Sequence, residues 1–241
     1  MFKRVSARIG LRGIGLAAAA LGLAMVVAPA PAQAATGNVT CTTDIENTVI
    51  TGNLTVPAGA ICTLGGVTVQ RNVSVGAGAS LQFVGTIVGG NVSVGAGAST
   101  FLDSITVQGN VSVGAGASFE AGGTVIQRNL STEGADNISI VFAEVDGNSS
   151  FDATSGTLSI CTDSNPACVL FTFNPGTLNP NPHGPANKFG NVSITNTAPG
   201  SVVYGGNFVA GNLTCSGNTF VTNLGIQNIV LGKESGQCVG L

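Results

Sequence analysis

A 19-residue repeat constrains the fold of this chain more than any other feature of its sequence. Two apolar columns follow the repeated asparagine at fixed offsets, one led by Leu54 and Val73 and the other by Val56 and Val75. The identical string NVSVGAGAS occurs three times. Because one repeat alone cannot bury its apolar face, successive repeats must stack on one another. The asparagines of the column are Asn53, Asn72, Asn91, Asn110, Asn129 and Asn148.

The pattern inside each repeat is that of short β-strands. Apolar and polar residues alternate, glycine-rich breaks separate three such segments, and no helical stripe is present after the N-terminal leader. Further apolar columns run through Val69, Val88 and Val107, and through Leu64 and Phe83. We therefore predict an all-β fold, a single-stranded parallel β-helix (β-solenoid) with 19-residue coils and a right-handed coil as the favoured hand.

The asparagine column predicts a ladder of stacked side-chain amides that fixes the register of the coils. We expect this ladder to be internal, with the asparagines turned inward. The column also creates N-x-S/T sequons such as Asn72-Val73-Ser74 and Asn91-Val92-Ser93. Serine or threonine at that place is what an outward strand position requires, so we interpret the sequons as products of the repeat and not as glycan acceptors.

The first 34 residues contain, in sequence, the three regions of a secretory signal peptide. Lys3, Arg4, Arg8 and Arg12 precede an apolar run over 14–27, and Ala32-Gln33-Ala34 provides a small-residue cleavage site. A transmembrane anchor is the alternative, but the run is short and rich in alanine and glycine. We predict a signal peptide over 1–34, a secreted solenoid domain over 35–241, possible attachment at the cell surface, and no membrane span after the leader is removed.

Charge argues against nucleic acid as a partner. Removal of the leader leaves four basic residues, Arg71, Arg128, Lys188 and Lys233, against eleven acidic ones, a net charge of −7. Four cations cannot supply the phosphate contacts that nucleic-acid binding requires.

The six cysteines all follow the leader, and an oxidising compartment favours disulfides. Their spacing leads us to predict the pairs Cys41–Cys62, Cys161–Cys168 and Cys215–Cys238. Metal binding is not predicted, because no CxxC pair is present and the single histidine, His183, is distant in sequence from every cysteine. Nothing in the sequence points to a cofactor.

The repeat is interrupted after Asn148. Two loop insertions are predicted, one near 161–168 and a proline-rich one near 174–188, because proline cannot lie inside a strand ladder. His183 and Lys188 make the second loop a candidate ligand-binding segment. Coils resume at Asn191, and the looser pattern over 213–241 indicates a C-terminal cap.

The GNVxVxxGA repeats, together with the terminal CSGN…GKESGQC segment, resemble a group of uncharacterised secreted bacterial β-solenoid proteins. The resemblance covers nearly the whole of the chain after the leader, and it implies a fold and a compartment but no reaction. The coil repeat is also similar to that of the polymer-forming bactofilins, which are cytoplasmic and lack this leader and these cysteines.

Three functions are compatible with the sequence. The first is a secreted structural or binding protein that contacts an extracellular glycan, an envelope polymer or an envelope protein through outward rows such as Thr55, Ser74, Ser93, Ser112 and Ser131. The second is a polysaccharide lyase or hydrolase of the β-helix class, with Arg128, Glu144 and Asp146 as candidate catalytic residues and Asp103 and Glu120 on neighbouring coils. For these residues a surface ion pair is the simpler interpretation. The third is ice binding, although no sustained T-x-T pattern is present.

Overall fold

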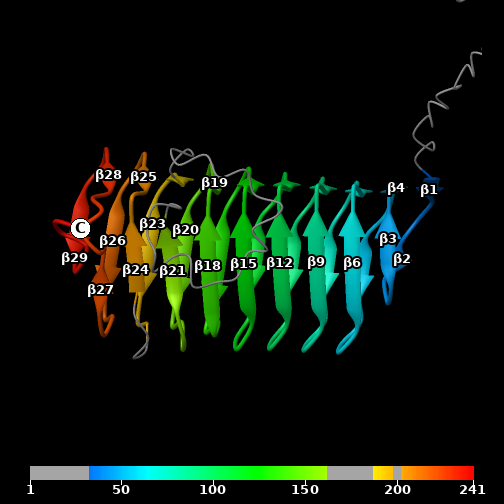
Figure 1. Ribbon diagram of the computed structural model, residues 1–241, viewed down its shortest axis with the longest axis horizontal. Helices are drawn as coiled ribbons and strands as arrows, with labels where there is room; N and C mark the ends of the chain where they lie inside the picture. The colour runs from blue at the N-terminus through cyan, green and yellow to red at the C-terminus, as the bar shows by residue number, and fades with distance from the viewer. Residues whose placement is uncertain (1–32, 162–186, 198–201) are drawn as a thin grey trace, which may run out of the picture. The chain divides into compact units, whose positions relative to one another are not determined.

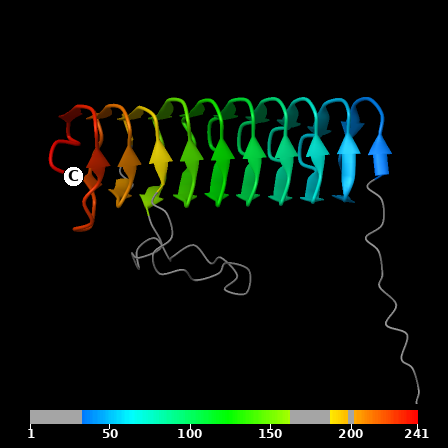
Figure 2. The ribbon, with the colours of Figure 1, turned by 90° about the horizontal axis from the view of Figure 1, so that it is seen from above.

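The computed structural model describes residues 33–161, 187–197 and 202–241. Within these ranges the chain is all-β, and its strands form three parallel sheets in which sequence neighbours always belong to different sheets. Figures 1 and 2 show the coils of the described residues following one another in chain order along one axis. The predicted β-solenoid is therefore confirmed. None of the described residues belongs to a helix capable of crossing a bilayer.

Each coil except the last contributes one strand to each of three sheets, A, B and C, and the last contributes none to sheet C. Sheet A comprises β1 (Gln33–Ala35), β4 (Thr48–Ile50), β7 (Thr68–Val69), β10 (Ile87–Val88), β13 (Thr106–Val107), β16 (Val125–Ile126), β19 (Glu144–Val145), β22 (Lys188–Phe189), β25 (Phe208–Val209) and β28 (Ile229–Val230). Sheet B comprises β2 (Val39–Thr40), β5 (Leu54–Val56), β8 (Val73–Val75), β11 (Val92–Val94), β14 (Val111–Val113), β17 (Leu130–Glu133), β20 (Ser149–Asp152), β23 (Val192–Thr195), β26 (Leu213–Ser216) and β29 (Glu234–Gly236). Sheet C comprises β3 (Asp44–Glu46), β6 (Ile61–Gly65), β9 (Ser80–Val84), β12 (Ser99–Asp103), β15 (Ser118–Gly122), β18 (Asn137–Val141), β21 (Leu158–Cys161), β24 (Val202–Gly205) and β27 (Val221–Thr222).

The register of the sheets follows the sequence repeat. Val92 pairs with Val73 on one side and with Val111 on the other, so each valine column becomes a line of residues spaced about 4.8 Å apart. The register survives the long interruption, because Ser150 of β20 pairs with Ser193 of β23, 43 residues later. The register of the described strands is therefore the same on both sides of the interruption.

The apolar columns lie inside the stack. In the sheet B strands β5, β8, β11 and β14 the two valines or leucines are buried and the central hydroxyl residue is exposed. Large side chains from all three sheets also fill the interior, among them Phe83, Phe119, Phe151, Phe189 and Tyr204. Burial of these columns supplies the main stabilising term of a fold whose coils touch only their neighbours.

The corner between sheets C and A requires a left-handed backbone in every coil from residue 47 to residue 142. The position is Asn47, Gly66, Gly85, Ser104, Gly123 or Phe142, and φ lies between 48° and 60° at all six. Glycine adopts this conformation without strain, whereas Phe142 does so at a cost of about 1–2 kcal/mol.

The predicted asparagine ladder exists, but its predicted location was wrong. The Nδ2 of Asn72 donates to Oδ1 of Asn53, and Asn110 donates in the same way to Asn91, yet the side chains are exposed or half-buried at the turn from sheet A to sheet B. The Oδ1 of Asn91 also accepts the backbone N–H of Asn110, at 2.8 Å. We call this the outer ladder. It forms outside because its amides satisfy backbone groups that the turn leaves unpaired.

A second, buried ladder lies in the C-terminal coils, where the 19-residue repeat did not indicate one. Asn187 donates to Asn207 at 2.8 Å, and Asn207 donates to Asn228 at 3.1 Å. Asn207 also donates to the Ile160 carbonyl, at 3.0 Å. These asparagines occupy the column that holds Thr86 and Thr124 in earlier coils, whose hydroxyls likewise bond to backbone carbonyls.

Two of the three predicted disulfides are present. Cys41 pairs with Cys62, with a Cα–Cα distance of 5.8 Å, and Cys215 pairs with Cys238, at 5.2 Å. They fasten the first and the last coils of the stack. Cys161 is buried at the end of β21, and Cys168 lies outside the described residues.

The predicted domain boundaries fall partly on residues that the structure does not describe. Residues 1–32 lie outside the described ranges, whereas Gln33 and Ala34, the last two residues of the predicted leader, pair with Thr48 and Val49 in sheet A. Most of both predicted loops and His183 also lie outside the described residues. Lys188 does not belong to the proline-rich loop, because it starts strand β22 and pairs with Glu144.

Candidate functional site

One uninterrupted file of hydroxyl side chains follows the outer face of sheet B from end to end. Each member is exposed or half-buried and pairs in register with the next, across the 43-residue interval as well. We call it the hydroxyl row. Its members are Thr40, Thr55, Ser74, Ser93, Ser112, Ser131, Ser150, Ser193, Thr214 and Ser235.

The outward columns of the other two sheets have no such uniformity. The outward column of sheet A passes from Thr106 through Val125 and Glu144 to Lys188. The central outward column of sheet C passes from Gln82 through Phe101 to Glu120. Because the same strand geometry accepts apolar, charged and aromatic side chains on those faces, folding alone does not explain a file made only of serine and threonine.

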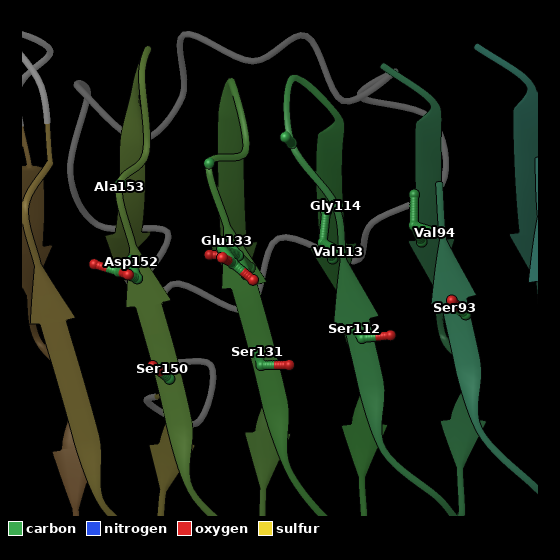
Figure 3. A pocket seen from close by; sticks show the side chains of 13 residues that line it. Ser93, Val94, Ser112, Val113, Gly114, Ser131, Glu133, Ser150, Asp152 and Ala153 are labelled. Carbon is green, nitrogen blue, oxygen red and sulfur yellow. The ribbon is translucent and has the colours of Figure 1, made fainter. Parts of the chain in front are cut away.

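A groove runs along the hydroxyl row in the middle of the stack. It has a volume of about 730 Å³, and the row supplies Ser93, Ser112, Ser131 and Ser150 to its lining. A second hollow of about 380 Å³ continues along the same face from Ser150 to Ser193 and Thr214. Figure 3 shows the serine side chains projecting from successive strands, with Glu133 and Asp152 beside them.

The groove lies where the corner between sheets B and C changes its construction. After β8, β11 and β14 this corner is a Gly-Ala-Gly turn, and its first glycine is tightly stacked in the second of them, since a Cβ on Gly95 would lie 2.8 Å from the Val75 carbonyl oxygen. From β17 to β26 the sheet B strand is one residue longer. Thr132 pairs in register with Val113 of the preceding coil. The residue after Thr132 is Glu133, whereas the residue after Val113 is Gly114. The Gly-Ala-Gly turns thus end at residue 116, and carboxylates line the space beyond them.

Glu133 and Asp152 face each other in register on adjacent coils. The next coil holds the Asp152 carboxylate, because Oδ1 accepts hydrogen bonds from Thr195 Oγ1 at 2.6 Å and from Asn196 Nδ2 at 3.1 Å. These bonds favour the ionised form, and they lower the pKa of Asp152 below its ordinary value. The groove therefore combines neutral hydroxyl groups with a fixed negative charge at one edge.

The three candidate catalytic residues from the sequence do not line this groove. Glu144 and Asp146 border a separate hollow of about 160 Å³ beside sheet A, together with Lys188. Glu144 forms an ion pair with Lys188, in which 3.7 Å separates Oε1 from Nζ, and both side chains are about half exposed. Arg128 lies close to Asp146 in the turn before sheet B, since its carbonyl accepts the N–H of Gly147. Within the described ranges no ion pair joins Arg128 to either acid.

The two further acids considered from the sequence lie on sheet C. Asp103 belongs to β12 and Glu120 to β15, where Glu120 pairs with Phe101 and not with Asp103. Partial burial raises the pKa of Glu120. The predicted carboxylates are thus distributed over two sheets. Among the described residues, no three metal-ligating side chains gather at one place.

Sequence reasoning found the hydroxyl row but missed Glu133 and Asp152. A signal for them was present, because aligning the repeats on the asparagine column places Glu133 opposite the first glycine of the Gly-Ala-Gly turn. The groove is lined by two carboxylates, yet of the described residues no basic one lines it. Comparisons with protein-family models, with curated proteins and with solved structures found no match to this chain.

Proposed function

We infer that this chain is a secreted, non-catalytic binding protein that holds an extended polysaccharide without acidic groups along the hydroxyl row of sheet B. The observation that carries this inference is the continuity of the row. Its hydroxyls repeat about every 4.8 Å, each can donate and accept a hydrogen bond, and the register persists across the interruption between Ser150 and Ser193. A linear polymer rich in hydroxyl groups matches such a linear array.

The charge of the groove supports a neutral polymer over an acidic one. Glu133 and Asp152 line it without a compensating cation from the described residues, so an acidic polysaccharide would be repelled there. The lyase alternative also lacks support, because proton abstraction beside an acidic sugar needs a basic group or a bound cation close to the reacting carbon. Binding without cleavage requires neither.

The form of the strands supports a linear ligand over an ice surface. In β8, β11 and β14 only the central residue points outward, so each of these coils offers a single hydroxyl on sheet B. The result is a single row of hydroxyl groups flanked by the amides of the outer ladder. A T-x-T surface would instead present two parallel rows of hydroxyl groups. A file suits a chain that runs along the stack.

The secreted location is part of the proposal. Two disulfides at the ends of the stack suit an oxidising compartment. The signal-peptide pattern of residues 1–34 supports export, and it predicts that the chain from the culture medium lacks that leader. N-terminal sequencing of the exported protein tests this part separately from ligand binding.

Co-sedimentation with insoluble polysaccharides tests the binding function. We expect the purified protein to sediment with cellulose or chitin and to stay in solution with cross-linked pectate, which is anionic. Replacing both Ser112 and Ser131 with tyrosine would fill the groove and should abolish sedimentation. Replacing Gln82, an exposed residue on sheet C, with tyrosine provides the control and should leave sedimentation unchanged. Sedimentation with pectate alone, or equal binding by both variants, would contradict the proposal.

A further inference from the structure

The C-terminal end of the stack exposes an unusual number of apolar side chains. Eight large apolar residues are exposed in the described part of the chain, and five of them lie between residues 220 and 239. We call these five the end patch. Its members are Phe220, Leu224, Ile229, Leu231 and Val239. Isolated exposed apolar residues are normal, but such a concentration at one end is typical of a contact surface.

The interior of the last coil is also incompletely covered. Val209 is fully buried, whereas Val230, its partner in the next strand of sheet A, is half-buried. Val202 and Val221 show the same change in sheet C. The chain after Cys238 provides a partial cap, since the Leu241 carbonyl accepts the backbone N–H of Asn228 at 3.3 Å. The cap leaves part of the core column open.

Three strand edges surround this end. β27, β28 and β29 are the last strands of sheets C, A and B, and each is paired on one side only. The outer backbone groups of an edge strand are a template for pairing with another chain. A partner that pairs all three edges at once must present three edges in the same triangular arrangement. The end of another solenoid with this cross-section has that arrangement, so a second copy of this chain is the occupant that fits.

We propose that two copies associate through their C-terminal ends as a closed two-fold dimer. In such an interface the end patch of one copy covers that of the other, which is the self-complementarity that a two-fold axis requires. The N-terminal end is a poor match for the end patch. Its sheet C strand, β3, carries Asp44 and Glu46, and a head-to-tail stack would set these acids against β27 of the next copy.

Residue Ile87 offers a matched control for the end patch. Ile87 and Ile229 occupy the same outward column of sheet A, one in the middle of the stack and the other in the last coil. Their side chains are 46% and 61% exposed, so lysine at either place projects into solvent without disturbing the core. Only the substitution at residue 229 would place a charge in the last coil, at the rim of the proposed interface.

Sedimentation equilibrium of the full chain, exported and purified, tests the dimer over a range of concentrations. We expect a reversible monomer–dimer equilibrium, with a Kd at least about tenfold higher in Ile229→Lys and unchanged in Ile87→Lys. Val239→Lys is a second variant, in which only an exposed residue of the cap changes, and it should weaken the dimer in the same way. A wild-type chain that stays monomeric would overturn the proposal. So would open-ended polymers, or folded variants that dimerise as tightly as the wild type.

Discussion

The hydroxyl of Thr195 donates a 2.6 Å hydrogen bond to the carboxylate of Asp152, although 43 residues separate the two in sequence. The bond joins β20 to β23 across the interruption of the repeat. It therefore links the acidic edge of the groove to the coil that follows the interruption, and the orientation of Asp152 depends on that coil being correctly stacked.

The first prediction concerns the ionisation of Asp152. Replacing Thr195 with valine removes the strongest of the bonds that lower the pKa of Asp152, so this pKa should rise toward its ordinary value of 3.8. Carboxyl-detected NMR titration measures the change, and Ser150→Ala, which alters the same strand without touching Asp152, is the control. An unchanged pKa in Thr195→Val would mean that the bond does not persist in solution.

The same substitution should also change how the free energy of unfolding depends on pH. A carboxyl group whose pKa is lowered by folding stabilises the native state above its unfolded pKa, and this contribution disappears as the pH falls through the folded pKa. The difference in unfolding free energy between the wild type and Thr195→Val should therefore be largest near neutral pH. It should shrink below pH 3.8.

The second prediction tests the inward and outward faces of sheet B. Val94 is buried in the valine column and Ser93, its neighbour, is exposed. Val94→Asp should lower the free energy of unfolding by at least about 2 kcal/mol more than Ser93→Asp, because an unpaired carboxylate loses its hydration in the core. Denaturant unfolding of the two variants gives the comparison. Equal loss of stability would mean that the two faces are wrongly assigned.

The third prediction concerns hydroxyl groups that are buried without a hydrogen-bond partner among the described residues. Tyr204 and Thr132 are two such residues. Burial raises the pKa of the Tyr204 phenol, which therefore stays neutral. Tyr204→Phe and Thr132→Val should each raise the free energy of unfolding by about 1 kcal/mol, since each removes a desolvated polar group and keeps the shape of the side chain. Destabilisation by both substitutions would show that the hydroxyls have partners, such as bound water.

The fourth prediction compares the two asparagine ladders. Asn207→Ala would remove three side-chain hydrogen bonds in the interior, those to the Ile160 carbonyl, the Asn228 amide oxygen and the Asn187 amide. Asn91→Ala would leave the backbone N–H of Asn110 unpaired at a turn that water reaches. We expect Asn207→Ala to lower the free energy of unfolding by about 2 kcal/mol more than Asn91→Ala does. Thermal unfolding of the two variants measures the difference, and equal costs would argue against a structural role for the inner ladder.

Much of the fold followed from the repeat itself. The spacing of Asn53, Asn72 and Asn91 predicted the coil length, and the columns led by Leu54 and Val56 predicted the buried positions. Sequence spacing also predicted the pairs Cys41–Cys62 and Cys215–Cys238. These features were accessible because a period fixes which residues stack, and stacking fixes burial.

The errors arose where side-chain direction is decided at a corner and not within a strand. The period cannot tell an inward asparagine from an outward one, because turns reset the alternation between strands. The outer ladder was therefore placed inside, and the inner ladder of Asn187, Asn207 and Asn228 was not foreseen. Lys188 was assigned to a loop because proline precedes it in sequence, whereas pairing with Glu144 draws it into sheet A.

The candidate site was only half predictable. The serines of the hydroxyl row follow from strand alternation, but the groove depends on where the Gly-Ala-Gly turn ends. That change places Glu133 beside Asp152. The aligned repeats show the replacement of the glycine by Glu133, but only the stacked coils show that the two carboxylates line one groove.

The fifth prediction addresses the central claim, that a repeating array binds one linear ligand. Isothermal titration calorimetry with soluble oligomers of the polysaccharide that sediments with the protein should show an affinity that rises with each added sugar, until the oligomer spans the groove from Ser93 to Ser150. The double variant Ser112→Tyr, Ser131→Tyr should remove this dependence on length. Affinity that is already complete with a disaccharide, or that is unchanged in the double variant, would contradict the account.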